Sequence, residues 1–131
     1  MPQTGNRPLS PHLQIYRLPL SAIVSISHRL TGVFLCLGLL VFLAVLITAA
    51  EGPQAYEPMR LWLQAWVGQG LLILFTYALY FHFCNGVRHL FWDAGYGFEL
   101  KTVHISSYAV IVVSILMTAA TWLAACGGNL L

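Results

Sequence analysis

The sequence contains very few charged residues. Only 8% of its 131 residues are Asp, Glu, Lys or Arg, whereas 59% are hydrophobic, and the mean hydropathy is +0.77. Soluble domains carry about 25% charged residues. Such a chain cannot cover itself with a hydrated surface, so we expect an integral membrane protein without a separate soluble domain. The formal net charge of only +2 gives no reason to expect a nucleic-acid partner.

Several patterns of known function are also missing. The three cysteines, Cys36, Cys84 and Cys126, stand far apart in apolar runs, and no CxxC pair or nucleotide fingerprint occurs. We therefore interpret the cysteines as buried hydrophobic residues rather than as ligands of a metal. The first 17 residues are polar and contain three prolines, unlike a cleavable signal peptide. We expect them to form an extended arm on the membrane surface.

Long uncharged runs predict three membrane-spanning helices, at about residues 20–50, 61–92 and 103–126. Residues 30–50 and 61–87 contain no Lys, Arg, Asp or Glu, and each run is long enough to cross a bilayer. The cluster Glu51-Gly52-Pro53 should end the first span, and residues 51–60 and 93–102 should form loops. The prediction is an all-α membrane protein whose residues 1–131 form a single membrane-anchor domain.

Basic residues are distributed unevenly between the expected loops. Arg7 and Arg17 precede the first span, Lys101 lies in the second loop and Arg88 stands at its edge, whereas the first loop holds only Arg60. Short loops rich in Lys and Arg stay on the cytoplasmic side. We therefore expect the N-terminus on the cytoplasmic (or matrix) side and the C-terminus on the periplasmic side.

Polar side chains interrupt the second span near its inner end. His82, Gly86 and His89 are spaced i, i+4 and i+7, so they share one helical face. A glycine between two histidines leaves a flat space beside the backbone. A planar cofactor could lie there, with an imidazole on its metal. The alternative is that His82 only forms a hydrogen bond with a neighbouring helix.

A second polar cluster, Ser25, His28 and Arg29, lies within one turn of the first span. A charge at the centre of a span costs about 2.5–3.5 kcal/mol on insertion scales, so Arg29 either snorkels to the interface or faces protein. At about 1.5 Å per residue, Arg29 lies roughly 13 Å and His82 roughly 15 Å from the inner ends of their spans. Two separate stretches therefore converge on one layer of the inner leaflet.

Two kinds of ligand would use this layer. A b-type haem takes two neutral imidazoles on its iron and cations at its propionates, and His82 lies deepest. The side chains nearer the interface, where propionates would lie, are His28, Arg29, Arg88 and His89. A quinone needs donors at its carbonyl oxygens, which Ser25 and Arg29 offer. Since no second iron ligand is evident, it should come from another chain.

These residues resemble the cytochrome b subunits of succinate dehydrogenase (respiratory complex II), the larger of the paired membrane-anchor chains. Two stretches carry the resemblance, residues 7–32 and 82–95. The first ends in Ser25-x-x-His28-Arg29-x-Thr31-Gly32. The second reads His82-x-x-x-Gly86-Val87-Arg88-His89-x-x-Trp92-Asp93-x-Gly95.

The resemblance implies roles for individual residues. His82 would be the axial ligand of haem b, with the second imidazole from the smaller anchor subunit. Ser25 and Arg29 would form part of the ubiquinone site, although Ser27 could replace Ser25 as the hydroxyl that faces quinone. His28 and His89 would support the haem propionates or the hydrogen bonds of the site.

The resemblance also implies an assembly. A second anchor subunit would complete the helical bundle, and an iron–sulfur subunit and a flavoprotein subunit would deliver electrons and oxidise succinate. The chain itself would not oxidise succinate. It would reside in the bacterial inner membrane, or in the mitochondrial inner membrane if it is a mature eukaryotic chain. The alternatives are a haem-free structural anchor, the anchor of a fumarate reductase, and a small transporter or histidine–metal membrane protein.

Overall fold

The computed structural model describes residues 17–127, and these form four helices and no strand. The helices are α1 (Leu20–Glu51), α2 (Pro53–Gln64), α3 (Trp66–Asp93) and α4 (Leu100–Gly127). Of these, α1, α3 and α4 are long and apolar enough to cross a membrane, which confirms the three predicted spans. The expected surface arm, with Arg7, lies outside the described residues except for its last position, Arg17, which is exposed.

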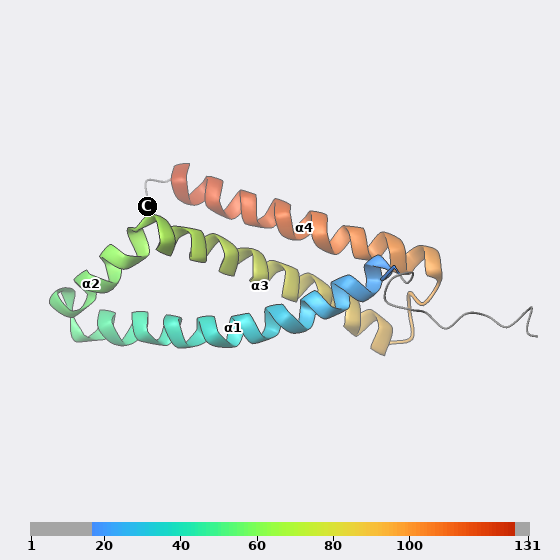
Figure 1. The fold of residues 1–131 in the computed structure, drawn as a ribbon, viewed down its shortest axis with the longest axis horizontal. Helices are drawn as coiled ribbons and strands as arrows, with labels where there is room; N and C mark the ends of the chain where they lie inside the picture. The colour runs from blue at the N-terminus through green and yellow to red at the C-terminus, as the bar shows by residue number, and fades with distance from the viewer. Residues whose placement is uncertain (1–16, 128–131) are drawn as a thin grey trace, which may run out of the picture.

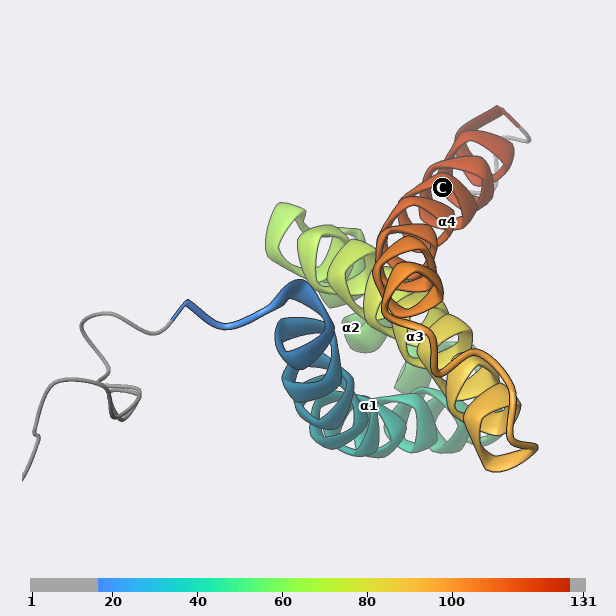
Figure 2. The same cartoon turned by 90° about the vertical axis from the view of Figure 1, so that its right-hand side faces the viewer.

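The middle of the three long helices is α3, which packs against α1 on one side and α4 on the other (Figures 1 and 2). A small core joins all three helices and consists of Val24, Phe81 and Val110. Most other large apolar side chains of the described residues are exposed. Such a surface needs lipid or another apolar chain around it, as expected of a membrane subunit.

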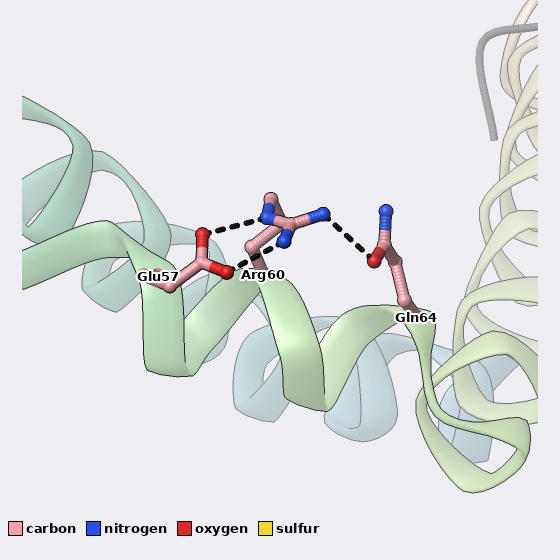
Figure 3. Close-up of polar contacts among 3 residues, drawn as sticks. All are labelled: Glu57, Arg60 and Gln64. Atoms are coloured by element: carbon pink, nitrogen blue, oxygen red, sulfur yellow. Dashed lines mark hydrogen bonds and ion pairs between the residues drawn. The ribbon is translucent and has the colours of Figure 1, made fainter. Parts of the chain in front are cut away.

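The prediction that residues 51–60 form a loop is wrong, because residues 53–64 form the helix α2. Pro53 occupies the first turn, where its missing N–H costs nothing, and Gly52 makes the corner after α1 with a φ of 109° that favours glycine. Arg60 donates two hydrogen bonds to Glu57, at 2.8 and 2.6 Å, and one to Gln64 at 2.9 Å (Figure 3). The hydrogen bond from Arg60 lowers the pKa of Glu57.

The second span begins at Trp66 rather than near residue 61, because Ala65 breaks the helix. Ala65 is extended, with φ −63° and ψ 151°, and its N–H still bonds to the Leu61 carbonyl at 3.1 Å. Gly68 lets α3 turn back against α2, since a Cβ there would overlap the Trp62 carbonyl. The uncharged run alone could not reveal this corner.

Small polar residues line the contact between α3 and α4. Ser107, Ser114 and Thr118 are buried, and each hydroxyl donates to the carbonyl one turn earlier on α4, at 2.7 Å for Ser107 and for Thr118. Because these hydroxyls are satisfied within α4, they need no partner on α3. Their small size allows the two backbones to approach closely.

A glycine also sets the contact between α1 and α3. A Cβ at Gly38 would overlap the ring of Phe75. We expect Gly38→Ala to destabilise the packing of α1 on α3 by about 1–3 kcal/mol, the usual cost of overpacking. Denaturation of the detergent-solubilised protein would measure the change.

The matched control for this substitution is Gly70→Ala. No atom among the described residues lies within 4 Å of a Cβ at Gly70, which is on α3. Alanine there should be neutral or slightly stabilising, because alanine favours helix more than glycine does. Equal stability of the two variants would show that the Gly38 contact is not needed.

Candidate haem and quinone site

The imidazole of His82 points from α3 onto α1. Its Nδ1 lies 3.1 Å from the backbone carbonyl oxygen of His28 and 3.4 Å from the hydroxyl of Thr31. The Thr31 hydroxyl in turn donates to the same His28 carbonyl at 2.9 Å. His82 is therefore held by the backbone of the neighbouring span.

This contact selects a tautomer of the His82 ring. A carbonyl oxygen can only accept, so Nδ1 must carry the hydrogen that is donated to it. In a neutral imidazole the other nitrogen, Nε2, then keeps a free lone pair. A hydrogen bond from one ring nitrogen to a backbone carbonyl is the usual support of a histidine whose other nitrogen binds a metal.

Three imidazoles from two helices form a stack. The ring of His28 lies over that of His82 with centroids 4.1 Å apart, and over that of His89 at 5.2 Å. The edge of Trp92 meets His89 at 5.0 Å and an interplanar angle of 89°. The structure thus brings together His28, His82 and His89, which the sequence had placed at one depth.

The stack does not form a metal-ion cluster. Parallel rings direct their nitrogens along their own planes rather than to a common point. In agreement, residues 17–127 contain no group of three or more His, Cys, Asp or Glu side chains that could hold a metal ion. The arrangement suits a single imidazole ligand supported by its neighbours.

Two glycines define the space around His82. Gly32 on α1 lies under the ring, and a Cβ there would be 3.0 Å from its Cε1. Gly86 on α3, one turn after His82, has no described atom within 4 Å of where its Cβ would lie. The first glycine lets His82 rest on α1, and the second leaves free space beside α3.

Ser25 and Arg29 lie on α1 close to this stack in sequence but outside its contacts. Ser25 and its rival Ser27 are both half-buried, and Arg29 is exposed. Within residues 17–127 the only ion pair is the one between Arg60 and Glu57, so Arg29 has no acidic partner there. An exposed guanidinium next to an apolar span is costly unless it meets an anion, a polar ligand or the interface.

Comparison with known proteins identifies the family. A model of the succinate dehydrogenase/fumarate reductase transmembrane subunit family matches residues 3–121. The chain belongs to this family.

Individual relatives cover most of the chain. The succinate dehydrogenase cytochrome b556 subunit of Paracoccus denitrificans is 44% identical over 117 residues, which are 89% of this chain and 90% of the relative. That of Rickettsia felis is 40% identical over 118 residues, 90% of this chain and 92% of the relative. The mitochondrial cytochrome b560 subunit of Bos taurus is 38% identical over 118 residues, 86% of this chain and 68% of the relative.

One basic residue of this succinate dehydrogenase family member lies away from the histidine stack. Arg88 had been expected near haem propionates, but it is buried on the α4 side of α3, 6% exposed. It donates to the Asn85 side chain at 3.2 Å and to the Val103 carbonyl at 3.4 Å, and its guanidinium lies 4.2 Å from the centre of the Trp92 ring. Arg88 follows His82 by six residues, and at 3.6 residues per turn the two side chains leave α3 about 120° apart. Arg88 therefore faces α4 and lies outside the histidine stack.

Sequence reasoning also missed two supporting groups. The first is the backbone carbonyl of His28, which holds His82 and has no signal in a sequence. The second is Thr31, one turn's spacing from His28, whose hydroxyl lies against both groups. The available clue was the pair Thr31-Gly32, which follows His28-Arg29 after one residue.

Proposed function

We propose that this chain is the haem-binding membrane anchor of a succinate:quinone oxidoreductase and contributes to its quinone-reduction site. The observation that carries the proposal is the hydrogen bond from His82 Nδ1 to the His28 carbonyl, which leaves Nε2 available as a ligand. The family and the cytochrome b names of the relatives agree with it. The reaction served is electron transfer from an iron–sulfur subunit to ubiquinone.

The residues present fit haem b. His82 would bind the iron through Nε2, and the free space beside Gly86 would receive the flat face of the porphyrin. Bound in this way, haem b would supply a one-electron redox centre. His28 and His89 would support the site from the inner side, where the family motif implies contact with the propionates.

The second axial ligand should come from the smaller anchor subunit. His28 stacks on both His82 and His89, so we expect these two rings to support His82 rather than to supply the second imidazole. His104 lies in the first turns of α4, beyond the described contacts of the cluster, and is exposed. A haem shared between two chains would also cover part of the exposed apolar surface.

Ser25 and Arg29 would act on the quinone. The Ser25 hydroxyl can donate a hydrogen bond to a quinone carbonyl oxygen, and Arg29 can stabilise the negative charge that develops there during reduction. The absence of an acidic partner for Arg29 among residues 17–127 leaves its charge free for this role. Succinate oxidation itself would take place on the flavoprotein subunit.

Two other functions remain as competitors. A haem-free structural anchor would use the histidine stack only for packing, and a fumarate reductase anchor would pass electrons in the opposite direction. The free Nε2 of His82 favours haem over the first. The family name covers both enzymes, and the relatives above are named for succinate dehydrogenase.

An absorption spectrum tests the proposal. The complex purified with this chain should show reduced b-type haem bands after dithionite addition, together with succinate-dependent ubiquinone reduction. A complex that reduces ubiquinone with no haem band would establish the structural anchor instead. Haem bands combined with fumarate reduction by quinol as the faster direction would establish the fumarate reductase anchor.

A further inference from the structure

A second site lies on the face of α3 that is turned away from α1. A groove of about 600 Å³ runs between α3 and α4 and reaches the loop that joins them. Its walls are apolar side chains, among them Phe83, Val87, Val113 and Met117. The histidine stack faces α1 and the groove lies on the α4 side of α3, and Trp92, whose edge meets His89, is the residue that borders both.

One charged side chain enters this apolar groove, the guanidinium of Arg88. Only two of its five N–H groups have acceptors in residues 17–127, and its Nε is buried without one. No Asp or Glu lines the groove, and Arg88 forms no ion pair within the described part of the chain. A buried cation without a counter-charge in a membrane span is expensive unless a ligand supplies the anion.

The position of Arg88 indicates where the anion would lie. Arg88 is near the C-terminus of α3, and the loop beside it brings Trp92 and Tyr96 to the groove. Aromatic residues of this kind gather at the membrane–water interface. Thr102, in the first turn of α4, lines the same end, where free backbone N–H groups also favour an anion.

The size of the groove limits what can fill it. From Thr102 to Met117 it follows α4 for about 22 Å, at about 1.5 Å per residue, which takes it from the interface past the middle of a 30 Å hydrocarbon core. A lipid acyl chain that begins at the interface can lie along this length of the groove.

We propose that this groove binds one membrane phospholipid, with its phosphate at Arg88 and an acyl chain between α3 and α4. The cation at the interfacial end and the apolar walls beyond it match the two parts of that molecule. The bound lipid would neutralise Arg88 and seal the open seam between the two spans. The site is independent of haem and quinone binding and requires only that α3 and α4 span the membrane.

Lipid titration of the purified complex tests the site. The complex is delipidated in detergent, reloaded with dioleoylphosphatidylglycerol, and the bound lipids are counted by native mass spectrometry. We expect Arg88→Gln to raise the concentration that half-fills one site about tenfold, equivalent to about 1.4 kcal/mol. The matched control is Lys101→Gln, because Lys101 is an exposed cation at the same end of α4 that does not line the groove. It should bind as the wild type does.

A second variant keeps the test decisive if Arg88→Gln does not assemble. Ala109→Phe fills the groove and leaves Arg88 in place. We expect this variant to bind one lipid fewer than the wild type. Lipid counts that are the same in the wild type and in Ala109→Phe would overturn the proposal, as would equal half-filling concentrations for Arg88→Gln and Lys101→Gln.

Discussion

Replacement of His82 by alanine should abolish the reduced b-type haem spectrum of the complex that contains this chain. The imidazole is the one group in the stack whose Nδ1 is fixed on a backbone carbonyl and whose Nε2 is free to bind iron. Alanine removes the proposed ligand, and the His28 ring cannot replace it, because it is stacked on the His82 ring and its nitrogens point along its own plane. The dithionite-reduced minus oxidised spectrum, normalised to complex concentration, measures the loss.

Two further variants separate a ligand role from simple packing. Gly86→Val leaves His82 intact but places a side chain in the free space beside it, so haem binding should fall although no neighbouring side chain or helix of the described residues lies within 4 Å of a Cβ there. His104→Ala removes an exposed imidazole at the start of α4 and should leave the spectrum unchanged. An unaltered spectrum in the His82→Ala complex would remove His82 from the ligand role.

The sequence predicted the membrane spans well because charge is excluded from the bilayer core. The uncharged runs located α1, α3 and α4, and Glu51-Gly52-Pro53 located the end of α1. It did not predict α2, because the prolines and glycine of this segment also suit a loop. The corner at Ala65 depends on the contact between Gly68 and the Trp62 carbonyl, which only the folded chain shows.

The sequence predicted which histidines lie close together but not the contacts that they make. Helical spacing and depth were enough to place His82, His28 and His89 in one layer, and the structure stacks them. The hydrogen bond to a backbone carbonyl leaves no trace in residue type. Arg88 was grouped with these histidines because of its depth, but depth does not set direction: Arg88 bonds to the Val103 carbonyl next to α4, whereas His89 stacks on His28 of α1.

Replacement of Arg29 by alanine should lower the rate of succinate-dependent ubiquinone reduction about 10- to 100-fold. A hydrogen bond from a charged donor is worth about 1.5–3 kcal/mol, and each 1.36 kcal/mol of barrier changes the rate tenfold. The loss should fall on quinone chemistry alone, because Arg29 is on α1 next to the stack and has no structural ion pair within residues 17–127. Reduction of a soluble dye by succinate, which bypasses the quinone, should stay within about twofold of the wild type.

Two control variants test separately whether the effect depends on the charge of Arg29 and on its position. Arg29→Lys keeps the positive charge but loses the planar set of donors, so its rate should lie between those of the wild type and Arg29→Ala. Arg60→Ala removes an arginine at the other end of the molecule, where it pairs with Glu57 on α2, and should not affect quinone reduction. If Arg29→Ala reduced the ubiquinone and dye rates by the same factor, Arg29 would serve assembly of the complex rather than the quinone. A selective loss that lysine restores in part, with the haem spectrum unchanged, would come from a positive charge that acts where the quinone is reduced.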